Sequence, residues 1–200
     1  MTTAAPDRVL RFSRTERAVH WTFTALFLAL LVTGLVLWVP PLATAVGQRE
    51  VVRRLHIWAG LALIPVPLAI GLAGDRHRVL RTARDLDRFD ADDRAFVLGR
   101  PSEPDRFNGG QRLNTWWTVI SAVLFLASGV VQWQWPSFPA GWRRGASELH
   151  DVLVVAGVAV LVGHIYLATL HRTTRPALRG IVTGWVRGDW ARTKHPRWRP

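Results

Sequence analysis

The stretch LHDVLVVAGVAVLVGHIYLATL, residues 149–170, contains one charged residue, Asp151, close to its start. The residues that follow it, 152–170, are uncharged and mostly apolar. A helix that crosses the hydrocarbon core of a bilayer needs about 20 such residues. The stretch therefore predicts a transmembrane helix, and this helix carries two histidines, His150 and His164.

Three other runs lack Asp, Glu, Lys and Arg over similar lengths, and Arg-rich connectors separate them. These runs are residues 18–39, 55–74 and 113–141. We therefore expect an all-α fold, an integral membrane four-helix bundle with helices at about 18–39, 55–74, 113–135 and 149–170. Pro65 and Pro67 are expected to kink the second helix, because proline removes a backbone donor.

The transmembrane domain, residues 18–170, lies between an N-terminal segment, 1–17, and a tail, 171–200. These two segments and the loop 75–112 hold 21 of the 26 Lys and Arg residues. Cytoplasmic connections are rich in Lys and Arg, so both termini are predicted to be cytoplasmic. The loop nearly balances its own charge and is expected to form a short surface helix. The net charge of +12 thus follows membrane topology, and no nucleic-acid partner is expected.

The first run has two features of a secretory signal, which are preceding arginines and the small residues 43–45. Its uncharged stretch is longer than a signal core and three comparable runs follow, so we expect it to remain as a helix. The chain has no Cys. This excludes disulfides, thiolate zinc sites and iron-sulfur clusters within the chain, so a bound metal must use His, carboxylates or backbone groups.

Four of the seven histidines fall within the apolar runs or at their edges, namely His20, His56, His150 and His164. An ionisable group in a membrane must be neutral, paired or coordinated, so these histidines indicate a functional site. A single histidine at a helix end is more often interfacial or hydrogen-bonded than a ligand, and the case therefore rests on all four together. The other three, His77, His171 and His195, are expected to be solvated or interfacial.

Alternating helix directions place the four histidines at two depths. His20 begins the first helix and His56 begins the second, so they lie near opposite faces of the bilayer. His150 and His164 lie on the fourth helix, about 21 Å apart at 1.5 Å per residue, and point to within roughly 40° of the same face. Depth therefore pairs His20 with His164 near the inner face and His56 with His150 near the outer face.

Two facing imidazoles at one depth suit a planar macrocycle between helices, with both axial positions of its iron filled. We therefore expect two b-type haems, one near each face, with the four histidines as ligands of the haem irons. Such closed sites transfer electrons and do not bind oxygen. Arg17 and Arg54, at helix ends, are expected to pair with haem propionates, with lipid headgroups as the alternative partners. Small residues that would let a porphyrin approach the backbone include Thr33, Gly34, Ser128 and Gly129.

Other classes of function stay open on these residues alone. A proton relay could use the histidines, but the runs contain no chain of Asp or Glu beyond Asp151. A transporter is expected to have broken helices at corresponding positions, and the prolines of the second helix have no counterpart in the fourth. The main alternative is a redox-inactive membrane anchor, which would hold a peripheral complex through its basic inner surface and would be colourless.

Several short motifs lie along the chain in a specific order and spacing. They are Arg11-Phe12, Glu16-Arg17-Ala18-Val19-His20-Trp21, Thr33-Gly34-Leu35, His56 with Gly60, Phe107-Asn108-Gly109-Gly110-Gln111, Leu149-His150-Asp151, His164-Ile165-Tyr166-Leu167-Ala168-Thr169, Gly184, Trp190-Ala191 and His195. Together they resemble the membrane cytochrome b subunit, called gamma, of respiratory formate dehydrogenases, which is related to the cytochrome b subunits of nickel-iron hydrogenases. The resemblance covers nearly the whole chain.

The resemblance implies that the four histidines are haem ligands in the pairs given above. It also implies a quinone site beside the inner haem, where Asn108 contacts menaquinone or ubiquinone together with His164, with Gln111 of the same motif as a further contact. From the residues alone, the segment Asn108-Gly109-Gly110 is instead interpreted as a loop that caps the third helix.

The resemblance further implies a place for the chain in a larger complex. It is expected to be a multi-pass protein of the bacterial cytoplasmic (inner) membrane, surrounded by lipid. Its implied partners are an iron-sulfur electron-transfer subunit and a catalytic dehydrogenase subunit, from which electrons pass through the haems to quinone. The chain would thus be a quinone-reducing subunit of an oxidoreductase complex, with no catalytic residue for the primary substrate oxidation.

Overall fold

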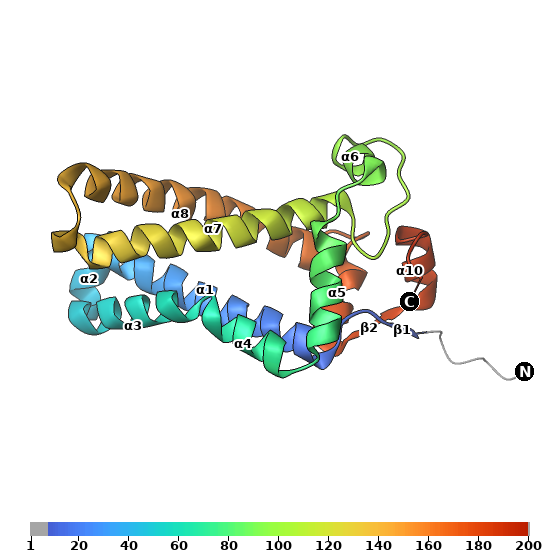
Figure 1. Cartoon of the computed structure of the whole chain (residues 1–200), viewed down its shortest axis with the longest axis horizontal. Coiled ribbons are helices and arrows are strands. Elements are labelled where there is room, and N and C mark those ends of the chain that lie inside the picture. The colour runs from blue at the N-terminus through green and yellow to red at the C-terminus, as the bar shows by residue number, and fades with distance from the viewer. Residues whose placement is uncertain (1–7, 200) are drawn as a thin grey trace, which may run out of the picture. The chain divides into compact units, whose positions relative to one another are not determined.

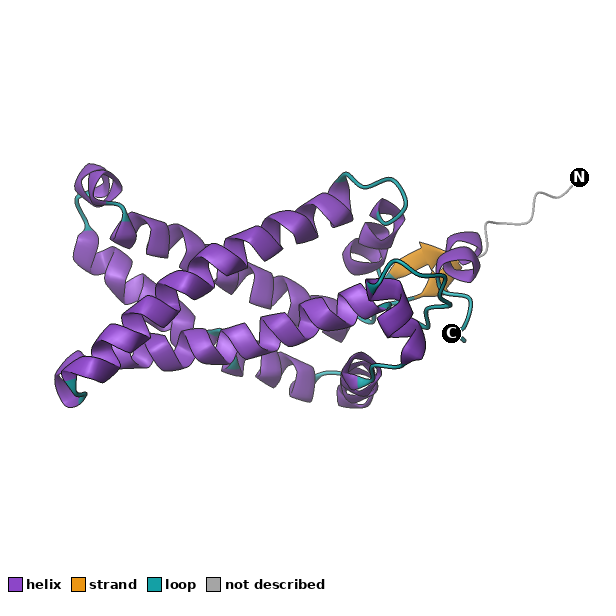
Figure 2. Cartoon of the chain, turned by 90° about the horizontal axis from the view of Figure 1, so that it is seen from above, coloured by secondary structure: helices purple, strands orange, loops and turns teal. Residues whose placement is uncertain are grey.

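The computed structural model describes residues 8–199, and the chain divides into two compact units. The first unit is formed by Met1–Arg17, Gly71–Thr118 and Val160–Pro200, and the second by Ala18–Ile70 and Val119–Ala159. The described residues are mostly helical, with one pair of short strands among them (Figure 2). The expected all-α class is therefore confirmed.

Three helices are each long and apolar enough to cross a bilayer. They are α1 (Arg14–Trp38), α7 (Gly109–Trp133) and α8 (Ala140–Thr169) (Figure 1). The most apolar stretches of these helices have mean hydropathies of 2.0, 1.5 and 2.2. Each helix begins before the span expected from its apolar run, because more polar residues continue the helix outside that run, over about one turn in α1 and α7 and over nine residues in α8.

The fourth expected span is a bent pair of helices, α3 (Arg49–Ala62) and α4 (Pro65–Ala73), with 41° between them. At the break, the N–H of Leu63 donates to the carbonyl of Gly60 over 3.3 Å, a tighter turn than that of an α-helix. Pro65 and Pro67 lack the N–H groups that would continue the regular ladder. The expected kink in this span is confirmed.

The long helices present large apolar side chains outward. On α8, Val152, Val155 and Val162 are 65%, 70% and 61% exposed. Only 11% of the most apolar stretch of this helix is buried in the protein. Soluble proteins rarely leave large apolar patches in water, whereas lipid tails accept such a surface. The pattern agrees with helices that cross a bilayer.

Short elements connect the long helices of the second unit. After α1, α2 (Pro40–Val46) begins with proline in its first turn and ends at Gly47, whose φ of 66° lies in the left-handed region that favours glycine. α7 is followed by the 3-10 helix η1 (Trp135–Ser137). In the first turn of α3, Glu50 forms exposed ion pairs with Arg53 and Arg54 at 2.9 and 3.0 Å.

In the first unit, the two ends of the chain pair as a small antiparallel ribbon. β1 (Arg8–Leu10) lies beside β2 (Trp185–Arg187), with Val9 opposite Val186 (Figure 1). Before β2, Gly184 has a φ of 95°, and its carbonyl accepts the N–H groups of Arg11 and Phe12 at 2.8 and 3.1 Å. No strand was expected here, because three residues carry too little periodicity to predict one.

The rest of the first unit is built from short helices. The loop before α7 contains α5 (Arg76–Asp87) and α6 (Ala91–Val97), so the expected surface helix is present as two helices. Asp75 caps α5 through the N–H of Arg78, and Asp90 and Asp93 cap α6 reciprocally. The C-terminal region adds η2 (Arg175–Ala177), α9 (Leu178–Thr183) and α10 (Gly188–Lys194).

A buried arginine, Arg11, lies at the centre of an aromatic cluster in this unit. It is 1% exposed, and its guanidinium lies 5.5 Å from the ring of Phe12, 6.0 Å from Phe107 and 5.2 Å from Trp190. Burial, with a smaller contribution from the charge of Arg106, lowers the pKa of Arg11 to about 9. The rings supply cation–π attraction, which offsets part of the cost of removing the charge from water.

Glu16, at the start of α1, joins three segments of the first unit. It is 8% exposed; Arg106 pairs with it at 2.8 Å, Arg78 approaches it at 3.6 Å, and the hydroxyl of Thr82 donates to it. It also accepts the N–H of Ser13 at 2.6 Å, as part of a capping box. Burial alone raises the pKa of Glu16, but hydrogen bonds from Thr82, Ser13 and Arg106 and the charge of Arg106 outweigh burial and lower this pKa.

We predict that Glu16→Gln lowers the free energy of unfolding by about 1–3 kcal/mol at neutral pH, because buried partners lose a charged acceptor. A carboxyl with a depressed folded pKa stabilises the fold above its ordinary pKa, here 4.5, and that contribution is lost as the pH falls through the folded pKa. Thermal unfolding in detergent, measured at pH 7 and then at successively lower pH, should therefore show a large difference between wild type and variant at pH 7 that shrinks as the pH falls through the folded pKa of Glu16, below 4.5.

The matched control is Glu50→Gln, which removes an exposed carboxylate that also pairs with two arginines. Solvent screens that pair, so its midpoint should change little at either pH. Equal losses for the two variants at pH 7 would contradict a stabilising role for the Glu16 cluster.

Gly109, the first residue of α7, allows a close approach to α6. A Cβ at this position would lie 2.3 Å from the backbone oxygen of Asp93. Backbone cannot yield as a flexible side chain can, so we predict that Gly109→Ala lowers the free energy of unfolding by about 1–3 kcal/mol. In Gly141→Ala, the matched change near the start of α8, the added Cβ meets no atom within 4 Å and should be neutral or stabilising. Denaturant titration in detergent compares the two, and equal midpoints would contradict the close approach.

Candidate functional site

Two of the four intramembrane histidines face each other within the second unit. His56 comes from α3 and His150 from α8. Their ring centroids lie 6.4 Å apart, with 58° between the ring planes. Both side chains are partly buried. The structure therefore brings together the pair that helix direction and depth predicted for the outer level.

His56 contacts two adjacent residues of α1. The hydroxyl of Thr33 lies 2.9 Å from Nδ1 of His56, and the same hydroxyl lies 2.6 Å from the carbonyl oxygen of Ala29, four residues earlier on α1. At Gly34, an added Cβ would lie only 3.2 Å from Cε1 of His56. The Thr33-Gly34 pair thus holds one edge of the imidazole.

His150 has the same kind of environment on α7. The hydroxyl of Ser128, a residue that is 3% exposed, lies 2.9 Å from Nδ1 of His150 and 2.7 Å from the carbonyl oxygen of Leu124. An added Cβ at Gly129 would lie 3.8 Å from Cε1 of the ring. The ring of Phe125 meets His150 edge-on at 5.1 Å. Both histidines therefore use Nδ1 for a contact within the protein.

The geometry of this pair fits a planar metallomacrocycle. Two histidine–metal bonds of about 2.0–2.1 Å each place opposite nitrogens about 4 Å apart, and the ring centroids lie further out on both sides. The observed 6.4 Å between centroids agrees with this spacing. Among the described residues there is no group of three or more His, Cys, Asp or Glu that could hold a metal ion alone. A group that supplies its own equatorial ligands, as haem does, suits two imidazoles.

The other predicted pair is divided between the two units. His20 belongs to the second unit, on α1, where its ring lies 5.1 Å from that of Trp21 in an edge-on arrangement. His164 belongs to the first unit, on α8, and is exposed. Their pairing at the inner level stays a prediction.

The two arginines expected near haem propionates have protein partners. Arg17 donates to three carbonyls at the end of α9, those of Ile181 at 3.2 Å, Thr183 at 3.3 Å and Val182. It thereby satisfies the terminal carbonyls of that helix. Arg54 is exposed and pairs with Glu50. Propionate binding by either arginine stays a prediction.

Asn108 and Gln111 form a reciprocal cap at the start of α7. The N–H of Gln111 donates to Oδ1 of Asn108 at 2.9 Å, and the N–H of Asn108 donates to Oε1 of Gln111 at 3.1 Å. The capping function inferred from the residues alone is therefore present. The cap uses only the amide oxygens. The two side-chain NH₂ groups take no part in it, and the predicted quinone contact would need such donors.

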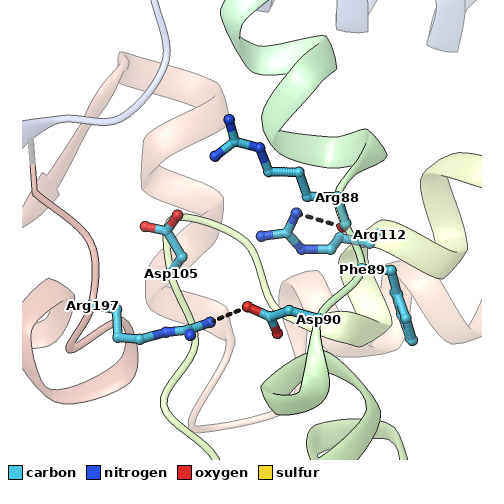
Figure 3. A pocket seen from close by; sticks show the side chains of 6 residues that line it. All are labelled: Arg88, Phe89, Asp90, Asp105, Arg112 and Arg197. Carbon is cyan, nitrogen blue, oxygen red and sulfur yellow. Dashed lines mark hydrogen bonds and ion pairs between the residues drawn. The ribbon is translucent and has the colours of Figure 1, made fainter.

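A separate pocket of about 500 Å³ lies in the first unit (Figure 3). It is lined by Arg88, Phe89, Asp90, Asp105, Arg112 and Arg197. Its charges are largely matched within the protein: Arg197 pairs with Asp90 at 2.8 Å, and Arg112 donates to the carbonyl of Arg88 at 2.7 Å. Sites for aromatic cofactors are mostly apolar, and neither Asn108 nor Gln111 lines this one, so it is not the predicted quinone site.

The expectation that His195 is solvated or interfacial is wrong. His195 is 3% exposed and lies between the rings of Trp190 and Trp198. Its Nδ1–H donates to the carbonyl of Asp105 at 2.6 Å, which connects the tail to the loop before α7. Burial and the charge of Arg11 lower the pKa of His195 to about 4, so the ring is neutral at pH 7. Its hydrogen-bond partner, Asp105, is too distant in sequence to predict.

Sequence reasoning assigned Thr33 and Ser128 only as small residues that leave room for a porphyrin. The structure shows them as hydroxyl partners of the two facing histidines. A signal was present in the repeated pattern of a hydroxyl residue followed by glycine, Thr33-Gly34 and Ser128-Gly129. The pattern predicts a histidine partner only when the fold is known to place it beside a histidine.

Several relatives of known type resemble this chain over most of its length. The formate dehydrogenase cytochrome b556(fdo) subunit of Escherichia coli is 30% identical over 199 residues, which cover 96% of this chain and 92% of the relative. The formate dehydrogenase cytochrome b556 subunit of Haemophilus influenzae is 24% identical over 205 residues, with 96% and 82% covered. The nitrate-inducible cytochrome b556(Fdn) subunit of Escherichia coli formate dehydrogenase is 21% identical over 206 residues, with 95% and 89% covered.

A family model extends the same result beyond single relatives. The model described as prokaryotic cytochrome b561 matches residues 11–184, a range that contains all four intramembrane histidines. Cytochromes b bind haem b, and the helices that can cross a bilayer agree with a multi-pass membrane protein. This chain therefore belongs to the prokaryotic cytochrome b561 family.

Proposed function

We propose that this chain is the dihaem cytochrome b subunit of a respiratory dehydrogenase complex of the formate dehydrogenase type. In this proposal it passes electrons from an iron-sulfur partner to quinone in a bacterial cytoplasmic membrane. The substrate class of the complex comes from the three relatives, each of which is named as a formate dehydrogenase subunit. Primary substrate oxidation belongs to the catalytic partner.

One observation carries the proposal, namely the approach of the His56 and His150 rings, whose centroids lie 6.4 Å apart. Two imidazoles are costly to bury in an apolar bundle, and a shared partner would offset that cost. Thr33 and Ser128 occupy both Nδ1 atoms, which leaves both Nε2 atoms to bind such a partner. We assign this pair as the ligands of the outer haem iron.

The inner haem is assigned to His20 and His164. This assignment follows from the depths of the histidines along the helices. α8 carries His150 and His164 on one continuous helix, about 21 Å apart by helical rise. A second iron at this distance would give the electron a path across the bilayer. The pairing depends only on alternating helix directions, so it is independent of which face is the cytoplasmic one.

Haem b, when bound, would supply one-electron transfer. His56 and His150 would hold one such group, and His20 and His164 would hold the other. The amide of Asn108 would donate to a quinone carbonyl near the inner level, because its oxygen is engaged in the helix cap and its NH₂ group is not. Gln111 would assist in the same way, with His164 as the third contact.

The orientation follows from charge. The first unit carries the Arg-rich segments, so we place both termini and the quinone end on the cytoplasmic side. We place the iron-sulfur partner at the opposite face, near His56 and His150; the alternative is docking on the Arg-rich inner loop and tail, from which the electron path would begin at the inner haem. Electron entry on one side and proton uptake on the other would contribute to the proton-motive force.

A redox-inactive anchor is the alternative from a different class. It would use the basic cytoplasmic surface and would need no imidazole pair inside the bundle. The facing histidines with matched hydroxyl partners favour the cytochrome, and the spectrum of the purified protein separates the two functions.

We predict two haem b groups per chain, measured by pyridine haemochrome quantification and by the dithionite-reduced minus oxidised spectrum. His56→Ala and His150→Ala should each remove one haem, and both should remove the same spectral component. His20→Ala and His164→Ala should remove the other component. The control is His77→Ala, which changes an exposed histidine of α5 and should leave both haems.

Two results would count against this reading. A colourless wild-type protein would support the anchor. Loss of one component in His56→Ala and of the other in His150→Ala would refute the assignment of these two residues to one iron.

A second prediction separates quinone binding from helix capping at Asn108. Asn108→Asp keeps an oxygen that caps α7 but replaces the amide donor, whereas Asn108→Ala removes both. Loss of one hydrogen bond of about 0.5–1.5 kcal/mol corresponds to an increase in KM of about two- to tenfold. We expect Asn108→Asp to raise the KM for a quinone analogue without changing haem content or thermal stability.

The KM is measured with the chain in its complex, with an analogue such as a short-chain menaquinone. If Asn108→Asp keeps the wild-type KM while Asn108→Ala lowers stability, capping is the whole function of this residue.

A further inference from the structure

We propose that Thr33 and Ser128 are a matched pair of positioning residues that accept the Nδ1–H of His56 and His150 and thereby set the redox potential of the outer haem. This inference rests on the proposed function, because it concerns the iron that these two histidines are assigned to hold. It concerns two residues, on α1 and α7, that contact the proposed ligand histidines but would not contact the iron. It also predicts the direction in which each one changes the midpoint potential.

The direction of each hydrogen bond follows from the number of protons on a hydroxyl. Thr33 has one O–H, and its oxygen lies 2.6 Å from the carbonyl of Ala29, which can only accept. Its contact with Nδ1 of His56 at 2.9 Å must then use an oxygen lone pair, so the imidazole is the donor. Nδ1 of His56 therefore carries the proton, the backbone of Leu30 is a further hydrogen-bond partner of the ring, and Nε2 is left as the proposed ligand atom.

His150 donates its Nδ1–H to Ser128 for the same reason. The O–H of Ser128 is directed to the carbonyl of Leu124 at 2.7 Å, so its oxygen accepts from Nδ1 of His150 at 2.9 Å. The hydroxyl is buried, and water does not compete for this contact. α1 and α7, which are far apart in the sequence, thus each provide a hydroxyl oxygen that accepts a hydrogen bond from the Nδ1 of a histidine.

The glycine that follows each hydroxyl residue supports a built arrangement. At Gly34 and Gly129, a side chain would approach Cε1 of His56 and His150 to 3.2 and 3.8 Å. The hydroxyl fixes the proton-bearing edge of the ring, and the glycine leaves room for that edge against the helix backbone. The repeated hydroxyl-glycine pair is therefore a cradle for an imidazole.

An acceptor on Nδ1–H makes an imidazole a stronger electron donor through Nε2 and fixes the plane of its ring. A stronger donor stabilises ferric iron relative to ferrous iron, which lowers the midpoint potential. Removing the acceptor from either histidine should raise that potential. Because the cradle serves only His56 and His150, the inner haem should not respond.

The test is a redox titration of the purified full-length protein with its haems bound, followed in the visible spectrum of each haem. Thr33→Val and Ser128→Ala remove the hydroxyls, and each should shift the ferric-to-ferrous ratio of the outer haem by up to about tenfold, which is about 59 mV for one electron. Thr33→Ser and Ser128→Thr keep a hydroxyl and should keep the wild-type potential. The matched control is Thr44→Val, which removes a hydroxyl that donates only to the carbonyl of Pro40.

Haem retention gives a second measurement if a hydroxyl-free variant binds haem weakly. Faster loss of the outer haem from Thr33→Val and Ser128→Ala, with normal retention in the hydroxyl-preserving variants, supports the inference. Unchanged potentials and retention in both hydroxyl-free variants overturn it. So does an equal shift in the hydroxyl-preserving variants, since that would report packing alone.

Failure of this inference and failure of the proposed function are distinguishable. If His56→Ala removes one haem but the hydroxyl variants leave its potential unchanged, only the positioning role falls. If His56→Ala leaves both haems in place, the ligand assignment itself is wrong.

Discussion

An imidazole inside an apolar helix bundle is tolerated only when both ring nitrogens have partners. In the second unit, Thr33 and Ser128 satisfy Nδ1 of His56 and His150, and the two rings face each other. We propose that the remaining nitrogens bind a shared partner between the helices. The proposal links the apolar sequence of the long helices to a redox cofactor, and the family membership of the chain supplies the cofactor class.

In the first unit, several buried polar groups are charged and are stabilised by ion pairs. Its buried carboxylates have arginine partners, as Glu16 has in Arg106 and Asp93 in Arg112 at 3.1 Å. Removing one partner of such a pair would leave an uncompensated buried charge. These pairs connect the start of α1, the loop helices and the start of α7, which is also where the cap formed by Asn108 and Gln111 lies. The segment proposed to bind quinone thus lies beside a network of buried ion pairs.

The sequence predicted what depends on local pattern and helix direction. Apolar runs predicted the long helices, Pro65 and Pro67 predicted the bend, and alternating direction predicted that His56 and His150 would meet. It did not predict features that depend on contacts between distant segments. Three such features depend on the tertiary fold: the β1–β2 ribbon, the buried hydrogen bond from His195 to the carbonyl of Asp105, and the hydroxyl partners of His56 and His150. Asn108 is interpreted both as a helix cap and as a quinone contact, and the two are compatible because its oxygen caps α7 while its NH₂ group takes no part in the cap.

The central claim, that His56 and His150 share one iron, is tested most directly by an experimental density map of the haem-loaded protein in a lipid nanodisc. The account predicts flat density between the two rings, with each Nε2 directed to its centre and each Nδ1 directed to Thr33 or Ser128. Continuous side-chain or lipid density between the rings, or rings rotated toward lipid, would contradict it.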